Sequence, residues 1–241
     1  MPTELAQPSQ NPVVQARSVR PSALRSAPLM TSRRDKPQEP RVTDLDLDQR
    51  LPDAHRWVSR LFWTPLEVVE RGVAWLDELG VGDVLDVGSG VGKWCVGAAL
   101  VDDSTRRYFG LEHRSDLVTV AAGLAASFGV ADRVTFHQGE VVDLLTVPGP
   151  IAHLLSAPAF YFFNPFGENT APDDERLDAA VELSEERFHR DVAAAEDLLE
   201  IAPPGTWVLV YNGFGGRMPD AYEPVRTDFD GFYVLRLWRK R

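Results

Sequence analysis

The chain has 241 residues, of which 44% are hydrophobic, and it carries 36 Asp or Glu against 25 Lys or Arg. A chain of this length buries a sizeable core, so one domain with a tail is expected. Its apolar runs are shorter than the roughly 18–20 residues of a membrane span, and no secretory signal pattern is present. Cys95 is the single cysteine, which excludes an intrachain disulfide. These features predict a cytoplasmic protein without a membrane segment.

Charge is distributed unevenly along the chain. Residues 1–43 hold seven Arg or Lys against three Asp or Glu, whereas the remaining residues hold 18 basic and 33 acidic side chains. The first segment is rich in Pro, Ser and Arg and has no aromatic residue, so a disordered tail is predicted for 1–43 and a folded domain for 50–241. An acidic domain disfavours nucleic acid as a partner, because affinity for phosphate backbones depends on Lys and Arg. The histidines show no metal-ligand spacing, so no metal is predicted.

The first helix signal lies at residues 64–67, which read Thr-Pro-Leu-Glu. Threonine is a capping residue, proline fits a first helical turn, and Glu67 completes a capping box. Gly80 is a stop signal, so a helix is predicted between these points. Its apolar stripe consists of Leu66, Val69, Val73 and Leu76.

Residues 84–94 read V-L-D-V-G-S-G-V-G-K-W, and they join the pattern of a buried strand to a helical one through a glycine turn. A dinucleotide-binding fingerprint counted from Gly88 requires glycine where Lys93 stands. A phosphate-binding P-loop requires Ser or Thr where Trp94 stands. The spacing therefore disfavours a nicotinamide dehydrogenase and a P-loop protein. A turn that only packs the helix on the strand is the structural alternative.

The remaining pattern, Asp86-x-Gly88-x-Gly90-x-Gly92, resembles the first motif of class I S-adenosylmethionine-dependent methyltransferases. The resemblance extends through most of residues 60–241. It implies a single α/β, Rossmann-like domain with a mostly parallel twisted sheet, flanking helices and a C-terminal antiparallel hairpin. It also implies S-adenosyl-L-methionine as the cofactor. The loop residues expected to contact it are Asp86, Gly88, Ser89, Gly90 and Gly92.

Two further strand ends complete the cofactor site that this resemblance implies. Residues 108–112 read as a strand ending in an acid, at the place where a carboxylate accepts hydrogen bonds from ribose hydroxyls. Residues 134–137 read as the next strand, and in the family an acid just past it accepts a hydrogen bond from the adenine amino group. Aspartate is usual there, so a glutamate is a departure. The contacts expected from these strand ends are Glu112, His113, Gly139 and Glu140.

Residues 159–166 contain four consecutive aromatics, which predict a strand, and end in Asn164-Pro165-Phe166. This end resembles the fourth motif of amino-group methyltransferases and the Asn-containing loop of the nucleosomal lysine methyltransferase outside the SET class. The resemblance implies that the amide oxygen and nearby carbonyls hold the target amine while a ring lines its channel. Asn164, Pro165 and Phe166 are therefore the candidate catalytic residues, and Asn164 is also a candidate cofactor contact. The missing second proline disfavours a nucleic-acid base as acceptor, and a strand that merely ends in a turn is the structural alternative.

The remaining elements complete the expected fold. Ser115 is expected to cap a helix that ends at Gly129, and the acidic stretch 172–200 is predicted to be helical with a solvated face. A fifth strand is expected at 206–211, followed by a glycine loop that could border the substrate pocket. A closing hairpin is predicted for the C-terminus, from segments 222–226 and 232–238.

The sequence therefore predicts methyl transfer from S-adenosylmethionine to an amine nitrogen, with a protein lysine or a small molecule as the acceptor. Alignment of donor and acceptor supplies most of the catalysis in such a reaction, and no general base is required. Two alternatives remain open at this point. One is methylation of a nucleic-acid base or a small metabolite, and the other is a non-catalytic module that binds S-adenosylmethionine.

Overall fold

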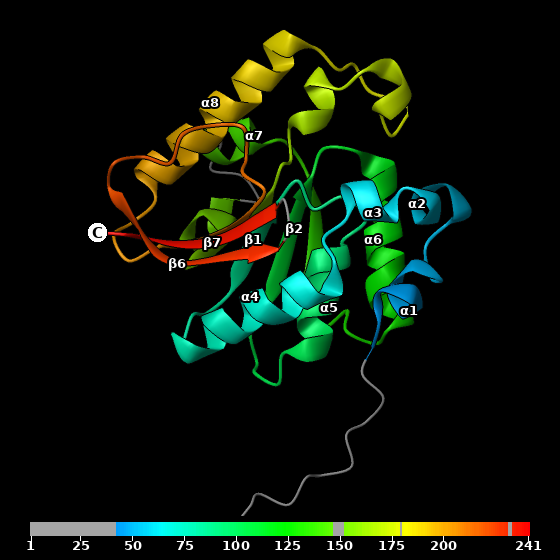
Figure 1. Ribbon diagram of the computed structural model, residues 1–241, viewed down its shortest axis with the longest axis horizontal. Coiled ribbons are helices and arrows are strands. Elements are labelled where there is room, and N and C mark those ends of the chain that lie inside the picture. Colours follow the sequence, from blue (N-terminus) through cyan, green and yellow to red (C-terminus); the bar gives the residue numbers. More distant parts are fainter. Residues whose placement is uncertain (1–41, 147–151, 179, 231–232) are drawn as a thin grey trace, which may run out of the picture. The chain divides into compact units, whose positions relative to one another are not determined.

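A computed structural model describes residues 42–146, 152–178, 180–230 and 233–241. Seven strands form one sheet in the order β3-β2-β1-β4-β5-β7-β6 (Figure 1). The strands β1 to β5 are parallel, β7 is antiparallel to β5, and β6 is antiparallel to β7. Their bounds are β1 Val84–Val87, β2 Tyr108–Glu112, β3 Val134–Gln138, β4 Ala159–Phe163, β5 Trp207–Tyr211, β6 Tyr222–Asp230 and β7 Tyr233–Lys240. The predicted mostly parallel sheet with a C-terminal antiparallel hairpin is confirmed.

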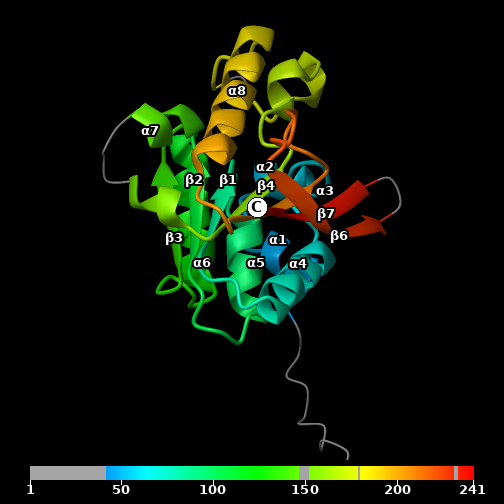
Figure 2. The same ribbon diagram turned by 90° about the vertical axis from the view of Figure 1, so that its left-hand side faces the viewer.

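Helices cover both faces of the sheet (Figure 2). One hydrophobic cluster packs α4, α5 and α6 on the first face, and a second cluster packs α7 and α8 on the other. The α-helices are α1 Asp44–Asp48, α2 Asp53–Trp57, α3 Ser59–Phe62, α4 Leu66–Glu78, α5 Lys93–Val101, α6 Ser115–Ser127, α7 Val141–Thr146 and α8 Glu185–Ile201. Short 3₁₀ turns lie at η1 Ala152–Ser156, η2 Gly167–Thr170 and η3 Asp173–Glu175. No helix in these described ranges is long and apolar enough to cross a membrane.

The strand β1 lies at the centre of the sheet, and all four of its residues are buried. Val84 packs into the first cluster, whereas Leu85 and Val87 pack into the second, because successive side chains of a strand point to opposite faces. The chain runs from β1 outward to β2 and β3, then returns to β4 on the other side of β1. This reversal makes the carboxyl ends of β1 and β4 a topological switch point, the usual position of a ligand site in such sheets.

Two of the predicted helix caps are wrong, although the helices are present. The Thr64 hydroxyl forms a hydrogen bond with the Tyr161 hydroxyl at 2.7 Å instead of capping α4. The Leu66 amide at the start of α4 donates to the carboxylate of Asp44, which is 22 residues earlier in the chain. Ser115 is the first residue of α6 and makes no capping bond, because Arg114 takes the cap position. In the first case a tertiary contact replaces the local cap.

The helix predicted for 172–200 is shorter than expected. It begins at Glu185, where the Ser184 hydroxyl accepts a hydrogen bond from the Arg187 amide at 3.1 Å. In the part of 172–200 that precedes Glu185, the 3₁₀ turn η3 takes the place of the predicted helix at Asp173–Glu175. The charged face of α8 turns outward as predicted, while Ala195 and Leu199 are buried against the sheet. The segment before α8 has a different role, because it borders the cavity described below.

A buried lysine joins the N-terminal helices to the sheet domain. Lys93, the first residue of α5, is 4% exposed, and its Nζ lies 2.6 Å from Asp44, 2.9 Å from Asp48 and 3.1 Å from the Ser59 hydroxyl. The folded part therefore includes α1, which precedes the expected domain start at residue 50. The tail expected for residues 1–43 lies, apart from Val42 and Thr43, outside the described residues.

Candidate functional site

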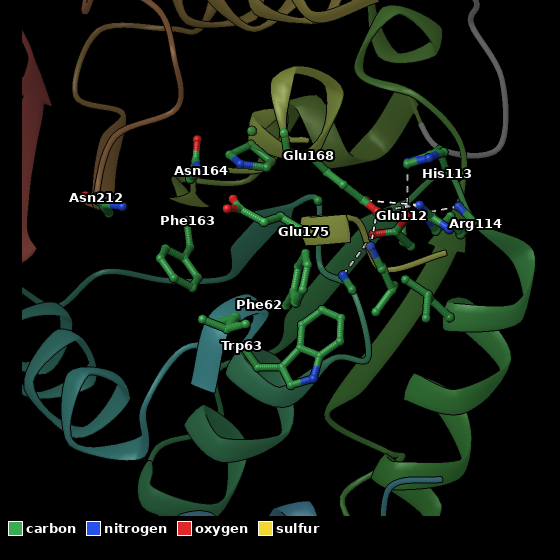
Figure 3. Close-up of a pocket in the computed structure, with 18 of the residues that line it drawn as sticks. Phe62, Trp63, Glu112, His113, Arg114, Phe163, Asn164, Glu168, Glu175 and Asn212 are labelled. Atoms are coloured by element: carbon green, nitrogen blue, oxygen red, sulfur yellow. Dashed lines mark hydrogen bonds and ion pairs between the residues drawn. The ribbon is translucent and has the colours of Figure 1, made fainter. Parts of the chain in front are cut away.

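A cavity of about 550 Å³ lies at the carboxyl ends of β1, β2, β4 and β5 (Figure 3). It opens at the switch point of the sheet, where the expected cofactor loop and the Asn164-Pro165 turn meet. Six of the residues singled out from the sequence line it. They are Gly88, Gly90, Glu112, His113, Asn164 and Pro165.

Two glycines of the first loop allow close packing that no other residue would permit. Gly88 and Gly90 have φ angles of 77° and 54°, in the left-handed region that disfavours side chains. A Cβ atom on Gly88 would lie 2.4 Å from Pro165, and one on Gly90 would lie 2.4 Å from the Trp63 ring. Gly92 lies behind the cavity, at the N-cap position of α5. Pro165 and Trp63 therefore pack directly against the backbone of the glycine loop that follows β1.

Glu112 is the buried carboxylate of the cavity. Its Oε2 accepts the Gly90 amide at 2.9 Å, its Oε1 accepts the Arg114 amide at 2.9 Å, and His113 Nδ1 lies 3.1 Å from Oε1. Burial alone would raise the pKa of Glu112, but the hydrogen bond from His113 and the two amides together hold that pKa below its ordinary value. Each carboxylate oxygen has two acceptor positions; Oε1 uses both, on the Arg114 amide and His113, whereas Oε2 retains one for a ligand. An ionised, preoriented acceptor therefore faces the cavity.

Asp86 and Ser89 line a small adjoining cavity of about 20 Å³ rather than the main one. The Ser89 hydroxyl is buried without a hydrogen-bond partner in the described part of the chain. Burial raises the pKa of Asp86 to about 8, and repulsion from Glu112 adds to this, although the Cys95 thiol donates to the carboxylate at 3.6 Å. Asp86 is therefore largely protonated at neutral pH. Cys95 is fully buried.

Asp86→Asn is expected to raise the melting temperature by an amount that grows from pH 5 to pH 8. The folded-state pKa, about 8, exceeds the ordinary 3.8, so the contribution of Asp86 to stability is complete below pH 3.8 and is lost as pH rises toward 8. Asparagine cannot ionise and lacks this loss, which is at most about 1.4 kcal/mol per pH unit. Melting curves of both proteins without ligand across this pH range check the prediction. A difference in melting temperature that does not change with pH would contradict it.

Gly139, Glu140 and Phe166 line another small cavity, of about 30 Å³, beside α8. The Glu140 carboxylate pairs with Arg187 at 2.7 Å and Arg190 at 3.3 Å, so it is already neutralised by α8. Phe166 is 7% exposed and packs into the second hydrophobic cluster, away from the main cavity. The ring expected to line the acceptor channel is therefore a core residue, and Phe163 lines the main cavity instead.

The ends of β4 and β5 carry two asparagines with positive φ, Asn164 at 40° and Asn212 at 56°. Asparagine tolerates this region better than other residues with side chains, but such conformations cost energy and often occur at functional sites. The two turns are joined, because the Asn164 amide donates to the Gly213 carbonyl at 2.8 Å. Both side chains line the cavity, and Figure 3 shows them on the same side of it as Phe163. Of the glycine loop after β5, Asn212 therefore borders this cavity.

Arg114 connects the cofactor side of the cavity to its opposite wall. Its guanidinium is 2% exposed and binds both oxygens of Glu168 at 3.0 Å (Figure 3). It also binds the carboxylate of Asp178. The Leu177 amide also donates to Glu168, at 2.6 Å. We call residues 167–178, which include η2 and η3, the roof segment. Its position depends on a buried arginine adjacent to Glu112.

Sequence reasoning missed several residues that line the cavity. No local sequence pattern distinguishes Phe62, Trp63, Arg114 or the roof segment. Tyr233 comes from the closing hairpin and reaches the cavity through β7. The further lining residues are Leu61, Leu117, Gly167, Glu168, Ala171, Glu175 and Leu177. No cluster of three or more potential metal ligands occurs within the residues that the structure describes.

Solved structures share this architecture. The mitomycin 7-O-methyltransferase MmcR matches with a TM-score of 0.50 and 15% identity, over 83% of this chain and 61% of the other. The fold is that of a class I methyltransferase. A cofactor-bound protein from MTB, Rv0187, matches with a TM-score of 0.53 and 16% identity, over 82% of this chain and 87% of the other.

An RNA methyltransferase from Salinibacter ruber, solved with S-adenosyl-L-homocysteine, is 25% identical over 73% of this chain and 92% of that chain, with a TM-score of 0.49. No protein-family model and no curated protein matches the chain. At their identities, the structures of MmcR and Rv0187 show the fold alone.

Proposed function

We propose that this protein transfers a methyl group from S-adenosylmethionine to an amine nitrogen of a protein lysine or a small molecule. The observation that carries the proposal is the shared cavity at the switch point. It joins Glu112, which is bonded to the Gly90 amide, to the Asn164-Pro165 turn. A cofactor bound by Glu112 and the glycine loop would present its methyl group to the Asn164-Pro165 turn.

The residues present fit the cofactor. The ionised Glu112 retains one acceptor position, on Oε2, which is suited to a ribose hydroxyl. His113 Nε2 is buried without a hydrogen-bond partner among the described residues, although the ring lines the cavity, so a polar ligand atom would satisfy it. Gly139 and Glu140 remain candidates for the adenine end, although the Glu140 carboxylate is paired with Arg187 and its backbone amide donates to Asp143.

S-adenosylmethionine supplies an electrophilic methyl group bound to a sulfonium sulfur. When a nucleophile attacks this methyl group in line, the sulfur departs as a neutral thioether. The chain has to align the acceptor and keep its lone pair free. The amide oxygen of Asn164 is suited to accept a hydrogen bond from an amine, which fixes the direction of the nitrogen. The Phe163 ring and the half-buried wall around it exclude water and favour the uncharged amine during attack.

The charge of the cavity favours an amine over a nucleic-acid base. Three carboxylates line it, Glu112, Glu168 and Glu175, against the single guanidinium of Arg114, which is already paired. A phosphate backbone would meet uncompensated negative charge there. A hydroxyl of a small metabolite and a non-catalytic cofactor-binding role are the competing functions.

Incubation of the purified protein with a matched cell extract and methyl-labelled S-adenosylmethionine tests the proposal. We expect label in amine groups of protein or small molecules, which acid hydrolysis and chromatography identify as N-methyl products. Calorimetry with S-adenosylhomocysteine in parallel is expected to show binding at micromolar levels. Binding without any label transfer would instead support the non-catalytic role, and label in nucleic acid or in ethers would contradict the amine assignment.

A further inference from the structure

We propose that the Glu175 carboxylate binds the acceptor as an alkylammonium ion, which gives its proton to solvent water before its nitrogen attacks the methyl group, and that this binding selects amines over alcohols. Glu175 lies at the end of η3, on the roof segment. The inference rests on the proposed function, because it takes the main cavity as the place where donor and acceptor meet. It adds a specificity-determining residue that lies on neither the cofactor loop nor the Asn164-Pro165 turn.

Glu175 is the carboxylate of the cavity that is left free. Glu112 accepts two backbone amides and His113, and Glu168 is bound by Arg114 and the Leu177 amide. The side chain of Glu175 has no hydrogen-bond or ion-pair partner within the described ranges. A free carboxylate lining a cavity produces a negative potential there that favours a cation.

The carboxylate of Glu175 is directed into the cavity. Figure 3 shows it extending from the roof segment toward the side where Phe163 and Asn164 lie, and Phe62 also lines the cavity. Aromatic faces attract cations through their quadrupole, so Phe62 would add to the attraction of the carboxylate. An ammonium group at this point would have its carbon chain along apolar surface and its nitrogen beside the Asn164 turn.

The backbone under Glu175 is held in place, which reduces the entropy cost of presenting the side chain. The Glu175 amide donates to the Pro172 carbonyl at 2.9 Å. Arg114 binds the roof segment on both sides of η3, at Glu168 and at Asp178. The adjacent Arg176 cannot neutralise Glu175 in this arrangement, because it binds the Asp173 carboxylate at 2.7 Å and the Ala171 carbonyl at 3.0 Å.

Asp174 offers a matched control. It lies in the same turn as Glu175, is exposed, and does not line the cavity. Asp174→Asn therefore removes the same charge from the same segment without touching the cavity. Glu175→Gln keeps the size of the side chain, and because Glu175 is exposed, neither variant is expected to change the melting temperature measurably.

The experiment uses n-butylammonium and butan-1-ol as probes, titrated into the full chain saturated with S-adenosylhomocysteine and followed by ligand-observed NMR. Both probes have the four-carbon chain of a lysine side chain. The n-butylammonium ion carries the positive charge that lysine has at neutral pH, whereas butan-1-ol is neutral. We expect the parent protein and Asp174→Asn to bind the cation at least about fivefold more tightly than the alcohol. Glu175→Gln is expected to bind both probes equally.

Two results would overturn the inference. One is a parent protein that shows no preference for the cation or no saturable binding of it, and the other is a preference that Glu175→Gln retains. The same samples report separately on the proposed function, through the affinity for S-adenosylhomocysteine before the probe is added. Loss of the cation preference with intact S-adenosylhomocysteine binding locates the effect at Glu175 and leaves the cofactor assignment standing.

Discussion

Glu112→Ala is expected to weaken S-adenosylhomocysteine binding by roughly 10- to 100-fold, which corresponds to the roughly 1.5–3 kcal/mol of hydrogen bonds to a charged group. Two effects contribute to the loss. The ribose hydroxyls lose an ionised acceptor, and the amides of Gly90 and Arg114 lose the partner that orients them. Because the pKa of Glu112 is held below its ordinary value, the parent protein should keep its affinity between pH 5 and pH 8 as far as this carboxylate is concerned.

Calorimetric titration of the parent, Glu112→Ala and Asp116→Ala measures this effect. Asp116 lies four residues further on, in the first turn of α6, is exposed and does not line the cavity. Its variant should bind like the parent. Equal affinity of Glu112→Ala and the parent for S-adenosylhomocysteine would show that the cofactor does not bind at Glu112. Binding of NAD in place of S-adenosylhomocysteine would contradict the proposed cofactor.

Asn164→Gly is expected to reduce turnover by at least roughly tenfold while S-adenosylhomocysteine affinity is unchanged, because it removes an interaction formed chiefly in the transition state. Glycine is the informative substitution at this position. Asn164 has a φ of 40°, which glycine adopts without strain, whereas alanine would add a backbone cost unrelated to the amide. The measurement is the single-turnover rate with the acceptor identified from labelled extract, beside the melting temperature.

Phe166→Ala provides the contrasting outcome. Phe166 is buried in the second hydrophobic cluster, so its truncation should destabilise the fold by about 3–5 kcal/mol and reduce cofactor binding together with turnover. If the Phe166 ring were catalytic, Phe166→Ala would instead reduce turnover and leave the melting temperature unchanged. For Asn164, normal turnover in a stable Asn164→Gly protein would mean that the active site lies elsewhere.

The elements that sequence reasoning found are those with a local cause. The buried run Val84–Val87 and the glycines after it predict strand, turn and helix, because a positive φ and an apolar pattern are properties of a few consecutive residues. Glu112 could be identified for the same reason, since an acid at the end of a strand is visible in the sequence. The closing hairpin also follows from alternation and turn residues.

The helix ends and the cavity wall show where local reasoning stopped. Asp44 replaces Thr64 as the partner of the α4 amide, and Arg114 holds a roof segment that starts more than 50 residues later. Glu140 follows the expected strand, but α8 places two arginines beside it. These pairings depend on which distant segments of the chain come into contact, and local patterns in a single sequence do not predict those contacts.

The sequence by itself determined the fold class and the glycine turn after β1, because hydrophobic periodicity and glycine spacing act within one element. The tertiary structure decided which side chains face the cavity. Phe163 rather than Phe166 lines it, since the turn at Asn164 sends the two rings to opposite sides. The same folding brings Glu175 and Asn212 to one site, because parallel strands align their carboxyl ends and the loops that follow them converge there.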